Sequence, residues 1–226
     1  MSIKDNYLCR MDFVTGATGI VGRELLAQLL ATGGEVRALR RESSDVQGVE
    51  EFILANGADT SNLSWVYGDT RDINEMRDAV CRCERVFHVA ALVSFIPSDS
   101  ERMMEINRGG TANVVNAMLD ADVKDLIYVS SVAAIGYIAD KLIDEEVPFE
   151  EGPLITAYSR SKYLSELEVW RGSEEGLDVV IVNPSIIIGP GDFSRSSGEL
   201  FSQIHRGTPF YPAGMNGFVS AKDVAR

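Results

Sequence analysis

Short apolar runs alternate with longer amphipathic stretches along this chain. Six runs have the length and composition of strands: 12–16, 35–40, 63–68, 85–91, 125–131 and 177–184. Between them, apolar residues recur with helical spacing at 20–31, 73–82, 100–121 and 157–171. Several strand runs are apolar at consecutive positions, which is typical of strands buried on both faces. The alternation of strand and helix predicts an α/β protein with a doubly wound parallel sheet and helices on both of its sides.

The pattern changes after Pro184. Residues 186–226 are rich in Gly, Pro and Ser and contain one short helical pattern, near 198–206. We expect residues 1–185 to form the sheet domain and residues 186–226 to form part of a loop-rich substrate-binding region. The final stretch, FVSAKDVAR, resembles the start of a further helix, so we interpret the chain as truncated.

Composition and charge exclude several classes of partner. The 226 residues have a net charge of −13 and are 45% hydrophobic, which suits a globular protein with one substantial core. The charge argues against nucleic acid or a membrane surface as a partner, and no apolar run approaches the roughly 20 residues of a membrane span. The N-terminus lacks the apolar segment of a secretory signal, which predicts a cytoplasmic protein. Cys9, Cys81 and Cys83 are too few for a disulfide framework, and we predict reduced thiols and no metal site.

A glycine motif follows the first strand, in FVTGATGIVGRELL. Gly16, Gly19 and Gly22 have the spacing GxxGxxG and stand directly before an amphipathic helix. Glycines let the backbone turn tightly and approach a pyrophosphate, while the helix N-terminus presents unpaired N–H groups to the anion. Thr18 adds a hydroxyl donor. The motif predicts a dinucleotide site, and the alternative is a glycine-rich turn without a ligand.

The end of the second strand bears on the choice of cofactor. Proteins that bind NAD usually place Asp or Glu there to hold the ribose 2′-hydroxyl. This chain has Arg40 and Arg41 instead. A guanidinium group suits the 2′-phosphate of NADP, and these two arginines are a local basic spot in an acidic protein. We therefore predict NADP, with NAD left open and two solvated surface arginines as the alternative.

The next two strand ends add further candidates. Asp69 closes the third strand, where its carboxylate can accept a hydrogen bond from the adenine amino group; the alternative is a helix N-cap. Ala90 and Ala91 end the fourth strand and leave room for a cofactor. His88 in the same strand is interpreted as a packed, neutral histidine.

The helical pattern over 157–171 carries Tyr158 and Lys162 one turn apart, on one face. A second pair with this spacing, Tyr137 and Lys141, stands in a polar segment without helical periodicity, and we interpret it as a loop coincidence. Three larger side chains of the helix are expected to form its buried stripe: Tyr163, Leu167 and Trp170.

Seven motifs occur in one order: TGATGIVG, GDTRD, HVAAL, INRGGT, YVSS, YSRSK and NPSIIIGPGD. In this order the chain resembles the extended short-chain dehydrogenases/reductases, the NAD(P)-dependent epimerase/dehydratase superfamily, over nearly its entire length. FHVAALVSF and the basic end of the second strand look most like the dihydroflavonol-reductase and hydroxysteroid-dehydrogenase branch. The resemblance implies a catalytic Ser–Tyr–Lys set with a supporting Asn, which falls on Ser131, Tyr158, Lys162 and Asn107. The predicted cofactor-binding set is Gly16, Thr18, Gly19, Ile20, Gly22, Arg40, Arg41, Asp69, Thr70, Ala90, Ala91, Tyr158, Lys162, Pro184 and Ser185.

The expected chemistry explains these residue types. Hydride transfer to a carbonyl leaves an alkoxide that needs a proton, and a free phenol with a pKa of about 10 is poorly matched to neutral pH. An ammonium nearby favours the phenolate, so Lys162 would make Tyr158 usable as an acid or base, and would also hold the nicotinamide ribose. Ser131 would steady the substrate oxygen. The resemblance gives Asn107 a proton-relay water to fix, with an ordinary polar helix residue as the alternative. The family more often has Arg at the position of Asn183.

Three functions compete at this point. The first is an NADP-dependent reductase of a carbonyl on a moderately large, apolar small molecule. The second is a nucleotide-sugar epimerase, which returns the hydride within one cycle; dehydration is disfavoured because Ser131 is followed by residues without a carboxylate. The third is a cofactor-sensing module, disfavoured because Tyr158 and Lys162 are both retained. The resemblance also implies a homodimer through the helices around 100–121 and 157–171. Specificity is expected to come from three loop-like segments: 92–100, 137–153 and 186–218.

Overall fold

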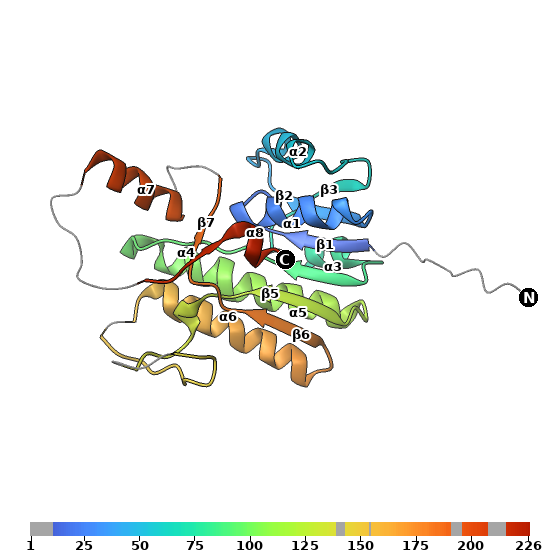
Figure 1. Cartoon of the computed structure of the whole chain (residues 1–226). Helices are drawn as coiled ribbons and strands as arrows, with labels where there is room; N and C mark the ends of the chain where they lie inside the picture. The colour runs from blue at the N-terminus through green and yellow to red at the C-terminus, as the bar shows by residue number, and fades with distance from the viewer. Residues whose placement is uncertain (1–10, 139–142, 154, 191–195, 208–215) are drawn as a thin grey trace, which may run out of the picture.

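The computed structural model describes residues 11–138, 143–153, 155–190, 196–207 and 216–226 (Figure 1). A six-stranded sheet forms its centre, in the order β3-β2-β1-β4-β5-β6 with parallel neighbours. The strands are β1 (Met11–Thr15), β2 (Glu35–Arg40), β3 (Leu63–Tyr67), β4 (Arg85–His88), β5 (Asp125–Val129) and β6 (Asp178–Val182). The predicted doubly wound sheet, a Rossmann-type fold, is confirmed. The strand order reverses between β1 and β4, and open α/β sheets bind ligands at the carboxyl end of such a switch point.

Helices cover the sheet in two layers (Figure 1). One layer packs α1 (Ile20–Ala31) beside α2 (Val46–Ala55). The other packs α3 (Ile73–Val80), α5 (Gly110–Asp120) and α6 (Ala157–Glu174) in a row. Each layer has its own apolar cluster against the sheet. Helices on both faces of the sheet therefore support the edge that carries the predicted site.

Two helical segments differ from the sequence pattern. The pattern did not predict α2, which buries only Val49 and Ile53 and contains Gly48, so its periodic signal is weak. The helix expected over 100–121 is divided into α4 (Ser100–Met104), a π-helical turn (Glu105–Gly109) and α5. A π-helical turn inserts one extra residue into the helix and is frequent at functional sites. This turn contains Asn107.

The chain beyond β6 forms smaller elements. β7 (Ile186–Ile188) and β8 (Phe218–Ser220) pair in a second, two-stranded parallel sheet. The helix predicted near 198–206 is present as α7 (Ser196–Arg206). The last helix, α8 (Ala221–Val224), packs on α1, where Gln28 Nε2 donates to the Lys222 carbonyl at 3.0 Å. The division of the chain into domains at residue 185 stays a prediction.

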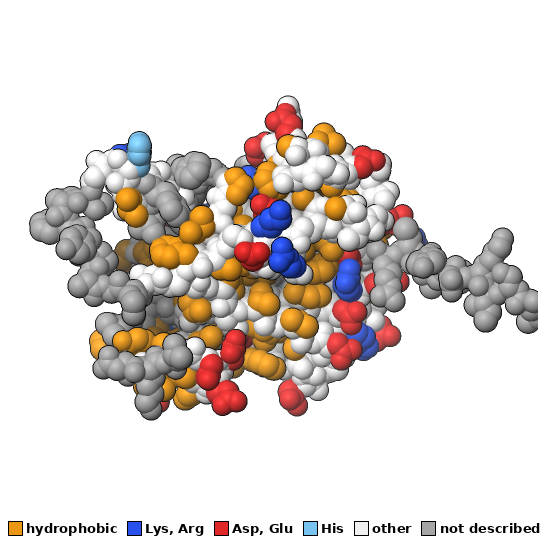
Figure 2. All heavy atoms as spheres, in the orientation of Figure 1, with side chains coloured by type: hydrophobic (Ala, Val, Ile, Leu, Met, Phe, Trp, Pro, Cys, Tyr) orange, Lys and Arg blue, Asp and Glu red, His pale blue; other side chains and the backbone are white. Residues whose placement is uncertain are grey.

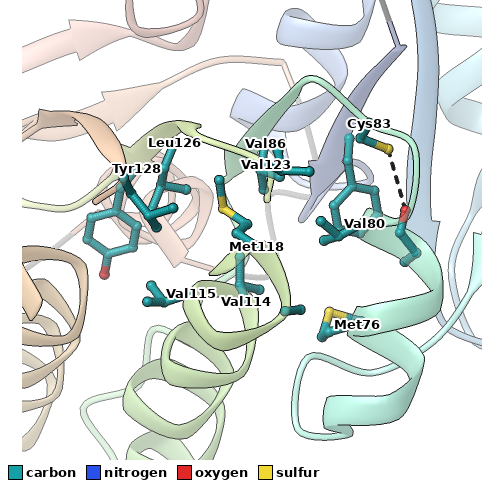
Figure 3. Close-up of a cluster of buried hydrophobic side chains, with 14 of the residues drawn as sticks. Met76, Val80, Cys83, Val86, Val114, Val115, Met118, Val123, Leu126 and Tyr128 are labelled. Carbon is teal, nitrogen blue, oxygen red and sulfur yellow. Dashed lines mark hydrogen bonds between the residues drawn. The ribbon is translucent and has the colours of Figure 1, made fainter. Parts of the chain in front are cut away.

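The larger apolar cluster lies between β4, β5, α3 and α5 (Figure 3). Cys83 belongs to it and donates a hydrogen bond from Sγ to the Ala79 carbonyl at 3.5 Å, and burial raises the pKa of its thiol to about 11. Cys81 and Cys83 are both free, as predicted, whereas Cys9 lies outside the described residues. Tyr128 has its ring in the cluster and its hydroxyl pointing out of it (Figure 3).

The stripe predicted for α6 is wrong. Leu167 and Trp170 are 43% and 51% exposed, and Tyr163 is partly buried against the ring of Phe149, at 4.2 Å between centroids. The helix instead buries small and polar residues: Ser161, Lys162, Ser165, Val169 and Gly172. Small residues let the helix approach the sheet closely, and the buried lysine finds polar partners there. Apolar spacing alone therefore pointed to the wrong face.

One face of the sheet is partly open. Figure 2 shows hydrophobic side chains gathered over β5 and β6 below α8. Val180 of β6 is 56% exposed. Among the residues that the structure describes, no helix is long and apolar enough to cross a bilayer.

Candidate active site at the carboxyl edge of the sheet

The glycine motif forms a tight turn between β1 and α1. Gly16 has φ +67°, and a Cβ there would lie 2.6 Å from the Ala90 nitrogen, so only glycine fits against the chain that leaves β4. A Cβ on Gly22 would collide with the Gly16 carbonyl oxygen. Gly19 is the N-cap of α1 and has no side chain to occupy the first-turn N–H groups. The turn thus leaves a helix N-terminus able to bind an anion. Thr18 and Ile20 flank this opening and are partly buried.

Arg40, the last residue of β2, and Arg41, which follows it, lie in different surroundings. Arg40 lies over the ring of Tyr67, with its Cζ 4.0 Å from the ring centroid. Arg41 lines a cavity of about 520 Å³ beside the ends of β2 and β3. The other lining residues are Glu42, Ser43, Tyr67, Gly68, Asp69 and Glu75. Of the predicted pair, Arg41 therefore faces the cavity while Arg40 stacks on one of its walls.

Asp69 is held by its near neighbour Arg71. Its carboxylate accepts hydrogen bonds from Arg71 N and Nε, both at 3.0 Å, and from Nη2 at 2.8 Å. The side-chain bond from Arg71 lowers the pKa of Asp69 below its usual value. The N-cap of α3 is Asp72, which accepts from Asn74 N and Glu75 N. The N-cap alternative for Asp69 is therefore wrong, and its contact with adenine stays a prediction.

Thr70 is buried behind Asp69. Its carbonyl accepts from Asn113 Nδ2 at 2.9 Å, and a Cβ on Gly110 would lie 2.6 Å from its hydroxyl. Thr70 therefore ties the loop after β3 to α5.

Ser131 lies two residues beyond β5, where it caps a short 3-10 turn (Val132–Ala134). Its Oγ accepts from Ala133 N at 3.1 Å, which leaves the hydroxyl hydrogen available to a ligand. Its carbonyl accepts from Asn183 Nδ2 at 3.2 Å, and Val132 N donates to the Pro184 carbonyl at 3.1 Å. The structure thus brings Ser131 and the predicted Pro184–Ser185 wall to the same edge.

Tyr158 lies in the first turn of α6, whose N-cap Thr156 accepts from Ser159 N at 3.0 Å. The Tyr158 ring is partly buried and contacts the exposed ring of Phe95 edge-on, at 6.1 Å between centroids. Lys162 follows one turn later and is 1% exposed. The helix therefore presents the phenol at the rim and the ammonium in the interior.

The Lys162 ammonium is fully enclosed by polar and aromatic groups. Its Nζ donates to Tyr128 Oη at 2.7 Å and to the Val129 carbonyl at 3.0 Å, and lies 4.4 Å from the Tyr128 ring centroid. Burial lowers its pKa to about 8, against the opposing influence of Tyr158 and Glu166. The ammonium thus lies against the Tyr128 hydroxyl, while Tyr158, one turn earlier on the same helix, favours its charged form.

Both polar atoms of the Asn107 carboxamide are hydrogen-bonded to other residues of the protein. Oδ1 accepts from Leu92 N at 2.7 Å, and Nδ2 donates to the Leu92 carbonyl and to Ser161 Oγ, both at 2.9 Å. Its own carbonyl accepts from Thr111 Oγ1 at 2.6 Å. Asn107 therefore joins the loop after β4 to α6, and the relay-water role stays a prediction.

His88 is a packed, neutral histidine, as predicted. Its Nδ1 lies 2.7 Å from Thr15 Oγ1 and its Nε2 lies 2.9 Å from Thr111 Oγ1. Burial lowers its pKa to about 3, and the positive charge of Lys162 acts in the same direction.

Of the second Tyr–Lys pair, the structure describes Tyr137. Tyr137 lies in a loop and is 71% exposed, which confirms the loop interpretation for that residue, while Lys141 lies outside the described residues. Ala90 and Ala91 stand just past the end of β4, which closes at His88 rather than at Ala91.

Sequence reasoning missed two polar groups of this edge. One is Tyr128, which was counted as part of an apolar strand. The other is Glu166, whose Oε2 accepts from Ser130 Oγ at 2.6 Å and from Asn183 Nδ2 at 3.0 Å. Its position one turn after Lys162 was a usable signal. Asn183, at the position where Arg is usual, therefore hydrogen-bonds a carboxylate.

Within the described ranges, no group of three or more His, Cys, Asp and Glu could hold a metal ion.

Comparisons with known proteins agree with this geometry. The model of the NAD dependent epimerase/dehydratase family matches residues 13–226. A Synechocystis sp. protein that carries the name of a dihydroflavonol 4-reductase is 37% identical over 217 residues, which cover 94% of this chain and 60% of that protein. This chain thus spans less than two thirds of that relative's length.

Two solved structures are also similar to this chain. The crystal structure of gox2253 has a TM-score of 0.83 at 36% identity and covers 95% of this chain and 64% of its own. A short-chain dehydrogenase/reductase superfamily protein from Agrobacterium tumefaciens, with bound NAD, has a TM-score of 0.65 at 25% identity and covers 79% of this chain and 50% of its own. With the family model matching from the first strand to the last residue, the chain belongs to the NAD-dependent epimerase/dehydratase family.

Proposed function

We propose that this chain is the cofactor-binding and proton-transferring part of an NADP-dependent oxidoreductase that interconverts a carbonyl and a secondary alcohol. The observation that carries the proposal is the pairing of Tyr158 at the rim with Lys162 buried one helical turn behind it. Both stand at the carboxyl edge of the sheet, the same edge that holds the turn of Gly16.

The residues present fit a dinucleotide. The closely packed turn from Gly16 to Gly22 and the first-turn N–H groups of α1 would bind the pyrophosphate, with Thr18 and Ile20 beside it. The cavity of about 520 Å³ would take the adenosine, next to Asp69 and Thr70. The nicotinamide, which supplies the hydride when bound, would lie among the small residues at the strand ends: Ala90, Ala91, Pro184 and Ser185.

NADP is preferred over NAD because of Arg41. Its guanidinium lines the adenosine cavity, and the acidic groups there, Glu42 and Glu75, would repel a 2′-phosphate unless a cation compensated them. Arg40, stacked on Tyr67, would support this wall. The Agrobacterium relative contains NAD, so cofactor choice needs its own test.

The protein groups would divide the proton chemistry among them. Tyr158 would give its phenolic proton to the developing alkoxide, and Lys162 would stabilise the phenolate that remains. Ser131 has its acceptor side occupied by Ala133 N and would donate its hydroxyl hydrogen to the same substrate oxygen. In the oxidative direction each transfer runs in reverse.

Apolar side chains around Tyr158 support a substrate with an apolar body. Phe95 is 75% exposed and touches the Tyr158 ring. Other large apolar residues of the neighbouring loops are also exposed: Val93, Ile96, Val132, Tyr137 and Ile138. Exposed large apolar groups on neighbouring loops are typical of a binding surface. A ketone on an aliphatic or aromatic framework fits this setting better than a nucleotide sugar.

A homodimer is the proposed assembly. The exposed Leu167 and Trp170 lie on the face of α6 that points away from the sheet, where an isologous helix contact would bury them. Sedimentation analysis checks this: a monomer at micromolar concentration would rule it out.

One assay separates the candidate functions. The purified chain is first titrated with NADPH by protein fluorescence, and is then incubated with NADPH and a panel of apolar ketones, or with UDP-sugars. Net oxidation of NADPH with a ketone supports the proposal. A converted sugar without net oxidation would establish the epimerase instead, and failure to bind NADPH would refute the dinucleotide site.

A further inference from the structure

The Lys162 ammonium has three N–H groups, and the protein interior takes two of them. One is donated to Tyr128 Oη at 2.7 Å and one to the Val129 carbonyl at 3.0 Å. Both partners belong to β5, so they approach the amine from the sheet side. Within the part of the chain that the structure describes, the third N–H is left without a hydrogen-bond partner.

The hydroxyl groups around Tyr128 require its own hydroxyl to act as a hydrogen-bond acceptor toward Lys162. Thr111 Oγ1 gives its only hydrogen to the Asn107 carbonyl at 2.6 Å. Ser165 Oγ gives its only hydrogen to the Ser161 carbonyl at 2.7 Å. Both oxygens interact with the Tyr128 hydroxyl and can only accept from it. Tyr128 therefore donates inward and is free to accept from Lys162.

The donors and acceptors of the neighbouring buried hydrogen bonds, which involve His88, can be assigned in the same way. With Thr111 Oγ1 already donating to a carbonyl, His88 Nε2 carries the hydrogen of their 2.9 Å contact. His88 Nδ1 then accepts from Thr15 Oγ1 at 2.7 Å. The hydrogens run from Lys162 inward and end on backbone carbonyls. The cluster thus anchors the amine and gives its proton no outlet.

We propose that Tyr128 is a positioning residue: its hydroxyl is the inner hydrogen-bond acceptor that holds the Lys162 ammonium in place and in its charged form, with one N–H left for Tyr158 and the cofactor. The part that concerns Tyr158 and the cofactor rests on the proposed function. The part that concerns the hydrogen bond from Lys162 to Tyr128 involves only Lys162 and β5.

The electrostatics of the amine give the proposal a measurable consequence. The groups that face Lys162 are Tyr128 from β5, the neutral His88 from β4, and Tyr158 and Glu166 from its own helix. Burial already lowers the pKa of Lys162 to about 8. Removal of an acceptor that favours the ammonium would lower this pKa further.

Tyr128→Phe isolates the hydroxyl. The variant keeps the ring, and with it the 4.4 Å cation–π contact, and removes one oxygen. Tyr163→Phe is the matched control. It also removes one phenol oxygen, at the residue next to Lys162 in α6, while its ring stays stacked on Phe149. Circular dichroism and thermal unfolding check that both variants fold.

The measurement is the titration of Lys162 by NMR, with lysine labelled with ¹³C at Cε. The chain has five lysines, so the resonances are few, and Lys162→Met identifies the one of interest. We expect Tyr128→Phe to lower the Lys162 midpoint by about one to two pH units, the effect of one hydrogen bond to a charged group. Tyr163→Phe should leave it unchanged.

Two outcomes would overturn the proposal. One is a Lys162 midpoint in Tyr128→Phe that equals or exceeds that of the unaltered chain. The other needs no variant: in the unaltered chain, Lys162 titrating together with the half-exposed Lys124 would show that the amine is not held by β5. Neither readout uses cofactor or substrate, so absence of turnover would count against the proposed function and leave the Lys162 result standing.

Discussion

Gly16 and Ala90 lie so close together that a Cβ on Gly16 would approach the Ala90 nitrogen to 2.6 Å. They are 74 residues apart in sequence, yet together they define the floor of the predicted pyrophosphate turn. Gly16 also has φ +67°, so its position combines a backbone conformation that favours glycine with a lack of space.

We expect Gly16→Ala to abolish NADPH binding and to lower the free energy of unfolding. Gly33→Ala is the control, because Gly33 has φ +79° with no atom within 4 Å of the added Cβ. That variant should lose only about 1–2 kcal/mol from backbone strain and should bind NADPH normally. Chemical denaturation and fluorescence titration measure both effects. Equal behaviour of the two variants would mean that the contact with Ala90 plays no part.

Tyr158→Phe should abolish turnover of any substrate found, by at least about 100-fold, because the variant has no proton to give. Its NADPH affinity should change little, since the ring and its contact with Phe95 remain. Tyr137→Phe, in an exposed loop, is the comparison. Steady-state kinetics would show the wrong tyrosine was chosen if Tyr158→Phe stayed active or if only Tyr137→Phe lost activity.

Arg41→Ala should weaken NADPH binding by roughly 10- to 100-fold, the effect of losing a charge-assisted hydrogen bond to phosphate, and should leave NADH binding nearly unchanged. Arg40→Ala should have a smaller effect, because Arg40 stacks on Tyr67 and does not line the cavity. Calorimetric titration of both cofactors gives the comparison. Parallel losses for NADPH and NADH in Arg41→Ala would remove the assignment to NADP.

Acid should destabilise the protein through His88. Its pKa is about 3 in the fold and near 6.5 in an unfolded chain, so the unfolded state takes up the proton first. Stability from this group is complete above about pH 6.5 and is lost progressively as the pH falls toward 3. Between pH 6.5 and 5 the loss is on the order of 2 kcal/mol.

The test compares the two histidines of the chain. Urea denaturation at a series of pH values should show a flatter pH dependence in His88→Gln than in the unaltered protein. His205→Gln, at an exposed position of α7, should keep the original slope. A slope that survives in His88→Gln would assign the acid sensitivity to other groups.

Several features were readable from the sequence because they depend on local order. The alternation of apolar runs predicted the parallel sheet, since strands buried on both faces are apolar at consecutive positions. The spacing of Gly16, Gly19 and Gly22 before a helix placed the turn. Tyr158 and Lys162 share a helix face by periodicity alone. Each of these statements involves residues within a few positions of one another.

The remaining features needed partners that are far apart in the chain. Tyr128 reads as one more apolar strand residue until α6 brings Lys162 to its hydroxyl, 34 positions away in sequence. The stripe of Leu167 and Trp170 was assigned to the wrong face because the polar residues of α6 are the ones with buried partners.

The roles of Arg40 and Arg41 show the same limit, because only the folded sheet decides which of two neighbouring side chains at the end of β2 faces the cavity. By itself the sequence determined the order of the six sheet strands and the chemistry available at each strand end. Tertiary structure alone decided which buried polar group would meet which partner, because a polar side chain in the interior is stable only where another element of the fold supplies its hydrogen bond.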